Sequence, residues 1–280
     1  MKKFINVIDV TLRDGIQSEK RILTTHQKFN ILNGLIRAGV TKLEVTSFVK
    51  NIPQFEDNKH FCRNLVNFRE VTYSALVPNV KGYTDMINSG NNIQEIVLFV
   101  SATNKFNKKN INATTIEAFE RFKDIVKLAK KDNLKIRGSI SCCFDCPYEG
   151  ETSVESVIDV IKRYNELGVD TLDIADTIGS GTTDKLRRIL DDALKIIPVE
   201  RVTGHFHDTN NNALQLVEKS LEYGISTFHS SLGGLGGCPY SSKIVGNLST
   251  EKLIDYLHSR GYKTNIELDK IKRLENIFKV

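Results

Sequence analysis

The sequence predicts an α/β protein folded as a (β/α)₈ TIM barrel. Eight short apolar segments rich in β-branched residues alternate with helical patterns along the chain. Parallel strands need helical crossovers, and eight strands close this barrel, so we favour it over an open doubly wound sheet. Helical patterns also end repeatedly at a glycine just before a strand, in the tripeptides AGV (38–40), LGV (167–169) and YGI (223–225).

The predicted strands are short, and each is followed by a turn or a helical pattern. They span 4–10, 42–47, 72–77, 95–100, 134–142, 171–175, 202–207 and 226–229. Between them, apolar residues recur at three- and four-residue spacings, which is typical of amphipathic helices. One helix is expected to start at Thr114 and stop near Asp132, and another to run from its cap Ser153 to Gly168.

Length and composition exclude several classes to which the protein could belong. No long linker divides the 280 residues, so we predict a single domain, 1–280, with 262–280 as a C-terminal helical extension. A net charge of +5 is too small to indicate nucleic-acid binding. No apolar run approaches the ~18 residues of a membrane helix, and charges interrupt the first segment before a signal-peptide core can form. We therefore expect a cytoplasmic protein without a membrane or nucleic-acid partner.

Polar residues gather at the predicted strand ends, where barrel enzymes carry their functional groups. We expect the following residues to converge on one rim: Arg13, Asp14, Gln17, Glu44, Ser47, Arg137, Asp173, Asp176, His205, His207, Asp208 and Asn247, together with the glycine-rich segment 233–237 and Cys238. This set contains carboxylates, imidazoles, an amide and arginines.

The His205-x-His207 pair is the most specific of these patterns. Alternate residues of a strand point to the same side, so both imidazoles can face one ion. Asp14 and Asn247 on neighbouring loops could add oxygen ligands, which favour Mg²⁺ or Mn²⁺. The alternative is a hydrogen-bonded pair of rim histidines without a metal.

Arg13 and Asp14 allow two interpretations. Asp followed by Gly is ordinary turn chemistry, so the pair could be a salt bridge at a helix start. Alternatively, Asp14 ligates the metal and Arg13 is a permanently charged donor for a developing oxyanion. Glu44 could then hold the guanidinium through two hydrogen bonds.

The five cysteines differ in their surroundings, and their odd number argues against a disulfide framework. Cys143-x-x-Cys146 could be half of a zinc site or a redox pair, but no further ligands have suitable spacing and the context is not thioredoxin-like. We favour structural cysteines there. Cys238 follows four glycines within five residues, a loop that could carry a thiol into a reaction site. The same glycines could instead let the backbone approach a phosphate.

Five segments in order resemble the 3-hydroxy-3-methylglutaryl-CoA lyase family, a branch of the metal-dependent lyase and acyltransferase superfamily with a TIM barrel. They are DVTLRDGIQSEK, RGSISCCFDCPYEG, DTIGSGT, HFHDT and GLGGCPYSSKIVGNLSTEKL. The resemblance extends from about residue 4 to residue 260. The cysteine-containing loop GLGGCPY is typical of the lyases rather than the synthases.

The resemblance implies a set of site residues and roles. Asp14, His205, His207 and Asn247 match the ligands of a divalent cation, Mg²⁺ or Mn²⁺. Arg13 matches the arginine that steadies the carbonyl oxygen and the enolate, and Glu44 matches the carboxylate that supports it. Asp176 and His205 match acid/base groups near the substrate hydroxyl, and Cys238 matches a catalytic loop cysteine.

The reaction implied is the metal-assisted retro-Claisen cleavage of 3-hydroxy-3-methylglutaryl-CoA, or a related 3-hydroxy-3-acyl-CoA, to acetyl-CoA and acetoacetate. Such a reaction belongs to leucine catabolism and ketone-body formation. The alternative is a Claisen-type synthase that joins acetyl-CoA to a 2-oxo acid. We expect an acyl-CoA substrate and a homodimer.

The sequence departs from the lyase pattern at three places. Residues 210–212 are all asparagine where the family has Tyr-Gly-Gln, and Asn211 could take the left-handed conformation of the glycine. Lys50-Asn51 replaces a longer segment that contains tryptophan, and Ser139 replaces a tyrosine. These positions are expected to border the substrate, so they bear on the acyl group and its carrier.

Overall fold

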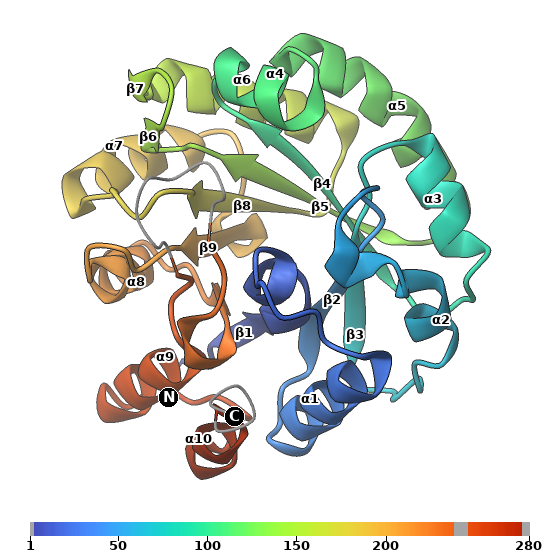
Figure 1. The fold of residues 1–280 in the computed structure, drawn as a ribbon. Helices are drawn as coiled ribbons and strands as arrows, with labels where there is room; N and C mark the ends of the chain where they lie inside the picture. Colours follow the sequence, from blue (N-terminus) through green and yellow to red (C-terminus); the bar gives the residue numbers. More distant parts are fainter. Residues whose placement is uncertain (1–2, 238–245, 276–280) are drawn as a thin grey trace.

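A computed structural model of the chain describes residues 3–237 and 246–275. Eight parallel strands close into a barrel in the order β1-β10-β9-β8-β5-β4-β3-β2, and helices surround it (Figure 1). The strands are β1 (Asn6–Asp9), β2 (Lys42–Ser47), β3 (Thr72–Leu76), β4 (Glu95–Ser101), β5 (Lys135–Ser141), β8 (Thr171–Asp176), β9 (Val202–Phe206) and β10 (Thr227–Ser230). Each predicted strand overlaps one of these, so the predicted barrel is confirmed.

The helices follow the strands in chain order. They are α1 (Thr25–Arg37), α2 (Asn58–Arg63), α3 (Val80–Ile87), α4 (Asn104–Ile111), α5 (Thr115–Lys131), α6 (Val154–Leu167), α7 (Thr183–Ala193), α8 (Ala213–Glu222), α9 (Thr250–Ser259) and α10 (Leu268–Glu275). The predicted ends of α5 and α6 are confirmed. The side chain of Thr114 accepts from the backbone of Glu117, and Gly168 ends α6 in the left-handed conformation.

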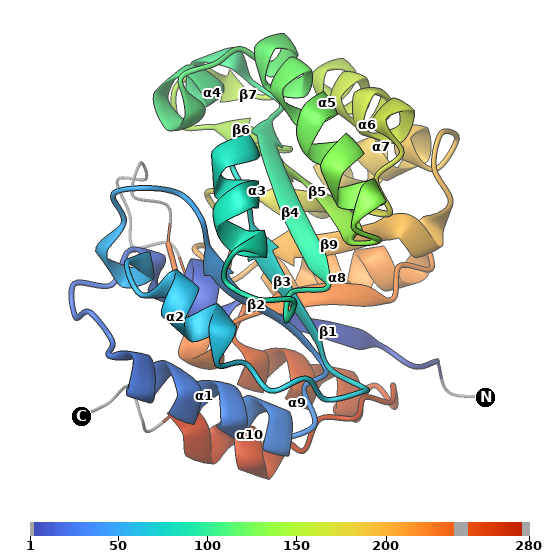
Figure 2. The same cartoon turned by 90° about the vertical axis from the view of Figure 1, so that its right-hand side faces the viewer.

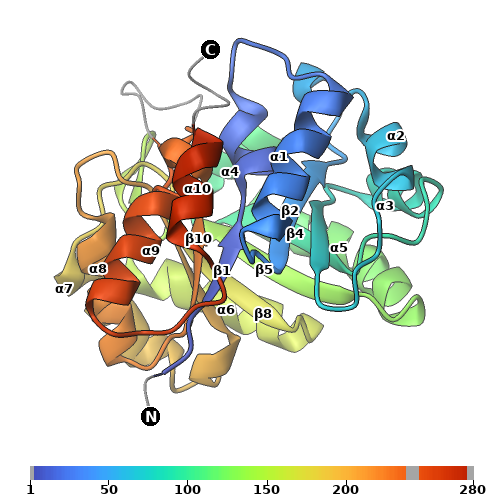
Figure 3. The same cartoon turned by 90° about the horizontal axis from the view of Figure 1, so that it is seen from below.

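The first helix and the last described helix pack together beside the barrel. Helix α10 packs against both α1 and α9, as Figures 2 and 3 show from the side and from below. Only α10 is helical within the described part of the predicted extension 262–280, because residues 262–267 run as an irregular segment. In this segment the Lys263 carbonyl accepts a hydrogen bond from the backbone of Ile5 (2.9 Å).

A continuous apolar core fills the space between the strands and the helices. Along β5, for example, Gly138 faces Tyr164 of α6, whose hydroxyl donates to the Leu98 carbonyl at 2.9 Å. The barrel interior is polar instead. Buried side chains there include Glu44, Ser74, Arg137, Asp173, Thr203 and His229. The interior of this barrel is therefore a charged column, whereas branched apolar residues usually fill this space.

Two local irregularities shape the rim. A π-helical turn, Thr11–Gly15, follows β1 directly and carries Arg13 and Asp14. The pairing of β2 with β3 shifts register between Glu44 and Thr46, and such irregularities often re-aim a side chain next to an active site.

A small hairpin of β6 (Asp145–Cys146) and β7 (Gly150–Glu151) follows β5. Among the described helices, none is long and apolar enough to cross a lipid bilayer.

Candidate active site

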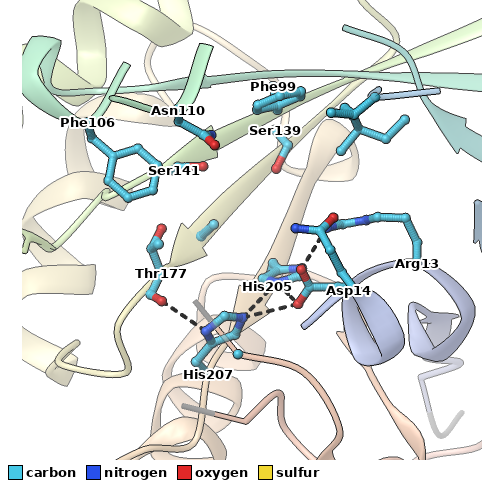
Figure 4. A pocket seen from close by; sticks show the side chains of 15 residues that line it. Arg13, Asp14, Phe99, Phe106, Asn110, Ser139, Ser141, Thr177, His205 and His207 are labelled. Atoms are coloured by element: carbon cyan, nitrogen blue, oxygen red, sulfur yellow. Dashed lines mark hydrogen bonds and ion pairs between the residues drawn. The ribbon is translucent and has the colours of Figure 1, made fainter. Parts of the chain in front are cut away.

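A cavity of about 180 Å³ opens at the carboxyl ends of the strands (Figure 4). Strand alternation directs side chains into it: Ser139 and Ser141 come from β5, and His205 from β9. Its wall also includes side chains that the sequence analysis did not single out, namely Val49, Leu76, Phe99, Phe106, Asn110 and Thr177. The cavity is therefore polar around Arg13 and the histidines, and its opposite side combines polar and aromatic side chains, namely Asn110, Ser139, Ser141, Phe99 and Phe106.

Arg13 and Asp14 both line this cavity from the turn after β1. Nη1 of Arg13 lies 2.6 Å from Oδ1 of Asp14, and Nε of Arg13 donates to Glu44. The salt bridge of the first interpretation therefore exists, but it faces the cavity and keeps both groups available to a ligand. Glu44 supports Arg13 as expected, although through one of its oxygens only.

Asp14, His205 and His207 form the one group of metal-ligating side chains found within the described ranges. Their ligand atoms all lie within 4.8 Å of one another. Nε2 of His207 lies 3.4 Å from Oδ2 of Asp14 and 3.3 Å from Nε2 of His205. The donor set fits a divalent cation, because a carboxylate and two imidazoles converge on one point.

The backbone of Thr177 orients His207 in the manner of a metal ligand. Nδ1 of His207 lies 3.0 Å from the Thr177 carbonyl, which can only accept, so the ring proton sits on Nδ1. Nε2 of His207 therefore presents its lone pair to the group. A carbonyl behind the non-ligating nitrogen is the usual support of a histidine that binds a metal.

Asn247 lies beside the same group. Its backbone pairs with His207, and its Nδ2 donates to Oδ2 of Asp14 at 2.6 Å and to the Leu235 carbonyl at 2.9 Å. In this arrangement Asn247 holds the Asp14 carboxylate by donating to it. Its predicted role as an oxygen ligand stays a prediction.

Burial and the charge of Arg13 set the protonation states of the group. Burial opposes ionisation of Asp14, but the Arg13 charge, followed by His207, outweighs it and holds the pKa of Asp14 well below its usual range. Burial lowers the pKa of His205 to about 3. An ionised carboxylate beside a neutral imidazole is the state in which both can ligate a cation.

Arg137 and Asp173 were expected on the rim, and that expectation is wrong. Both lie inside the barrel, where Nη1 of Arg137 is 3.2 Å from Oδ2 of Asp173 and Nη2 is 2.7 Å from Oε2 of Glu44. Arg137 is only the third residue of β5, and Asp173 is the third of β8. Both side chains therefore lie too far before the carboxyl ends of their strands to reach the rim. Their position within the predicted strands was the signal that could have placed them.

His229 of β10 also contacts the site, although it was not among the predicted site residues. Its Nδ1 lies 2.7 Å from Nδ1 of His205, and its Nε2 lies 2.8 Å from Nη1 of Arg137. It connects the charged column to the metal-ligating group. The available signal was a titratable histidine at the end of the predicted strand 226–229.

Asp176 ends β8 but does not line the cavity. Its carboxylate accepts from the backbone of Gly181 at 2.8 Å and of Ser180 at 3.0 Å. Burial raises its pKa to about 6, although these two hydrogen bonds partly offset the rise. Asp176 therefore shapes the loop beside Thr177, and its predicted acid/base role stays a prediction.

The cysteines of the described residues are free and buried. The thiol of Cys143 donates to the Ile140 carbonyl at 3.0 Å, and Cys146 accepts from the Thr103 hydroxyl at 3.2 Å. Burial raises the pKa of Cys143 above its ordinary value, which is typical of an unreactive structural thiol. Cys238, the predicted catalytic cysteine, lies outside the described residues.

The departures from the lyase pattern have clear positions. Asn211 has a φ of 58°, so it does adopt the left-handed conformation expected of it. Asn51 also takes positive φ (62°), within the turn that follows β2. Ser139 lines the cavity, so a hydroxymethyl group stands where the lyases have a larger side chain.

The fold and the site define a barrel with a candidate divalent-metal centre at its carboxyl face. A family model described as HMGL-like matches residues 4–278, and the chain belongs to this family. The human mitochondrial hydroxymethylglutaryl-CoA lyase is 36% identical over 278 residues, which cover 99% of this chain and 85% of the relative.

Solved structures show the same likeness. The HMG-CoA lyase from Brucella melitensis superimposes with a TM-score of 0.95 at 36% identity, covering 99% of this chain and 98% of that one. An HMG-CoA lyase from Acinetobacter baumannii, in complex with coenzyme A and 3-methylmalate, gives a TM-score of 0.93 at 31% identity and covers 98% and 90%. Relatives in this family are named as mitochondrial in some cases and as cytoplasmic in others.

Proposed function

We propose that the protein is a divalent-metal-dependent carbon–carbon lyase that cleaves 3-hydroxy-3-methylglutaryl-CoA to acetyl-CoA and acetoacetate. The observation that carries the proposal is the convergence of Asp14, His205 and His207 beside Arg13 at the mouth of the barrel. Membership of the HMGL-like family supports it, and the relatives named as lyases favour cleavage over the alternative synthase.

Asp14, His205 and His207 would hold the cation, Mg²⁺ or Mn²⁺, and Asn247 would join them by turning its amide oxygen toward the group. When bound, the cation supplies Lewis acidity, which lowers the pKa of a hydroxyl that it polarises. The ionised state of Asp14 supports this role, because the carboxylate needs no deprotonation before it ligates.

Arg13 would stabilise the negative charge that develops on the thioester oxygen as the carbon–carbon bond breaks. Its guanidinium is held on two sides by Asp14 and Glu44, so it is oriented before the substrate arrives. A preorganised donor of this kind typically contributes about 10²–10³ in kcat. The planar fork of arginine suits this task better than a lysine, whose ammonium is a mobile point charge.

Proton transfers would involve three residues. The base that removes the hydroxyl proton would be His205 when its Nε2 is not engaged by the cation, with Asp176 as a relay or alternative, and a group positioned for this step typically contributes 10²–10⁴-fold. The raised pKa of Asp176 supports such a role. Cys238 would then protonate the enolate carbon of the departing acetyl-CoA.

A coupled assay of acetyl-CoA release tests this function. The substrates are 3-hydroxy-3-methylglutaryl-CoA and a small panel of 3-hydroxy-3-acyl thioesters, each with and without Mn²⁺. We expect release that depends on the metal and is fastest with the methylglutaryl compound. No release from any thioester, with consumption of acetyl-CoA in the presence of a 2-oxo acid, would instead establish the synthase.

Two expectations accompany the proposal: the protein forms a homodimer, and it works in the cytoplasm. Light scattering of the purified protein measures the first, and a mass near 63 kDa, twice the 31.6 kDa of the chain, is the expected result. Fractionation of the source cells measures the second.

A further inference from the structure

We propose that His229 is a positioning residue that selects the tautomer of His205, and so determines whether His205 can ligate a cation. The inference rests on the proposed metal site. His229 is buried on β10, behind His205, and has no direct contact with Asp14 or His207 among the described interactions. It acts only through the ring nitrogen of His205 that faces away from the cavity.

The direction of each hydrogen bond follows from the chemistry of the partners. A guanidinium can only donate, so Nη1 of Arg137 donates to Nε2 of His229 across 2.8 Å. The ring proton of His229 then sits on Nδ1 and is donated to Nδ1 of His205 across 2.7 Å. His205 consequently carries its own proton on Nε2.

The remaining hydrogen bonds of this series, which runs from Arg137 through the three imidazoles to Thr177, agree with this direction. Nε2 of His205 lies 3.3 Å from Nε2 of His207, whose lone pair can accept the proton. The other nitrogen of His207 donates to the Thr177 carbonyl across 3.0 Å. Each donor in this series of hydrogen bonds therefore has an acceptor, the last of which is the Thr177 carbonyl. Each imidazole carries one proton.

This arrangement is incompatible with ligation by His205. A metal ligand needs the lone pair of Nε2, and in the chain described above that nitrogen is protonated. For His205 to ligate, its proton must sit on Nδ1, and Nδ1 of His229 must then accept. His229 must in turn carry its proton on Nε2.

An acceptor for that proton is in place. Oδ1 of Asp173 lies 3.4 Å from Nε2 of His229, on the same side as Arg137. The structure thus offers His229 two partners, the donor Arg137 and the acceptor Asp173, which correspond to its two tautomers. Arg137 retains Glu44 and the other oxygen of Asp173 when it releases the imidazole.

The exchange conserves protons. The N–H bond at His205 Nε2 breaks and one forms at His205 Nδ1, while the bond at His229 Nδ1 breaks and one forms at His229 Nε2. Each ring keeps one proton, so no acid, base or co-reactant is consumed. His229 therefore adds a coupled proton rearrangement to cation binding at Asp14, His205 and His207.

Nitrogen NMR of the wild-type protein tests the inference without any substitution. In ¹⁵N-histidine-labelled protein freed of metal, we expect His205 to be protonated on Nε2 and His229 on Nδ1. Addition of saturating Mg²⁺ should reverse both assignments and leave His207 protonated on Nδ1. Unchanged tautomers of His205 and His229 in Mg²⁺-saturated protein would overturn the inference.

Substitutions of His229 give an independent measurement, the affinity for Mn²⁺ followed by the EPR signal of the free ion. In His229→Asn the amide oxygen can occupy the place of Nδ1 and accept from His205, so affinity should match or exceed that of the wild type. In His229→Gln the amide reaches toward Arg137 instead and leaves His205 without its acceptor. Affinity should then fall about 10- to 100-fold, as for other lost supports of metal ligands.

Ser74→Ala is the matched control. Ser74 accepts from Nη2 of Arg137 at 3.1 Å, so its loss weakens the same buried column without touching an imidazole. It should lower the melting temperature and leave the Mn²⁺ affinity unchanged. Equal affinities in wild type, His229→Asn and His229→Gln would reject the role of His229, whereas failure of the wild type itself to bind Mn²⁺ would reject the proposed metal site.

Discussion

Oε2 of Glu44 lies 2.7 Å from Nη2 of Arg137 in the barrel interior, where neither side chain is exposed to solvent. The other oxygen of Glu44 accepts from Arg13 at the cavity. One carboxylate thus joins the charged column to the site, and burial, which would raise its pKa, is outweighed by the two arginines, so that the pKa is lowered. Glu44 stays ionised because both neighbours are permanently charged.

Glu44→Gln should destabilise the protein, because it leaves two buried guanidinium groups with one fewer counter-charge. Breaking a buried ion pair typically costs about 3–5 kcal/mol, measured here as the free energy of unfolding in urea. Glu120→Gln is the control, since Glu120 pairs with Lys123 on the surface at 2.7 Å and such a pair contributes up to about 1 kcal/mol. Similar losses in the two variants would contradict this account.

His207→Ala should abolish the rise in melting temperature that Mn²⁺ produces in the wild type. The substitution removes the imidazole that lies between Asp14 and the Thr177 carbonyl. His258→Ala is the control, because the His258 imidazole lies on the far, exposed side of α9 and contacts the Thr264 hydroxyl rather than the site. An unchanged Mn²⁺ shift in His207→Ala would show that the cation is held elsewhere.

Cys238→Ser should slow turnover far more than it weakens Mn²⁺ binding. The expectation rests on the family pattern, in which this loop cysteine takes part in catalysis, and on the weaker acidity of a hydroxyl compared with a thiol. The measurements are kcat with 3-hydroxy-3-methylglutaryl-CoA and the Mn²⁺-induced shift in melting. Equal turnover in the two proteins would leave Cys238 a structural residue.

Gly236→Ala should weaken Mn²⁺ binding about tenfold or more. Gly236 has a φ of 117°, and a Cβ there would collide with Nδ2 of Asn247 and approach Oδ2 of Asp14 to 3.3 Å. Gly150→Ala is the matched control, since its φ is also positive (78°) but a Cβ would meet nothing within 4 Å. Both variants carry the strain of alanine at positive φ, so a loss of affinity confined to Gly236→Ala isolates the collision.

Asp9 makes stability depend on pH. Burial raises its pKa to about 7, despite the opposing hydrogen bonds from Thr11 and Thr250. The folded protein thus retains a proton that the unfolded chain loses near pH 3.8, so this contribution to stability is complete below pH 3.8 and is lost as the pH rises to about 7.

Asp9→Asn removes that dependence. The free energy of unfolding of the variant, relative to the wild type, should rise between pH 4 and pH 7 by a few kcal/mol at most, since one pKa unit corresponds to about 1.4 kcal/mol. Urea titrations of both proteins at intervals of half a pH unit measure it. Parallel pH profiles would show that Asp9 is ionised throughout this range.

The strands and the rim residues were predictable because their signals are local. Alternation places His205 and His207 on one side of β9, and the turn after β1 places Arg13 and Asp14 beside them. The charged column was not predictable, because Glu44, Arg137 and His229 come from strands far apart in the chain. Only the register of the closed barrel brings them together. The contacts of Asp176 were not predictable either, because they come from backbone N–H groups of the loop at Ser180 and Gly181.

The parallel pairing of β1 with β10 closes the barrel between its first and last strands, in register from Asn6 with Thr227 to Asp9 with Ser230. Asp14 follows one side of this seam, while Asn247 and Gly236 follow the other. During synthesis Asp14 leaves the ribosome more than 200 residues before Asn247, so a growing chain cannot bring Asn247 beside Asp14 until its last strand is seated. At the proposed site, cation binding would therefore report on closure of the barrel as well as on the reaction.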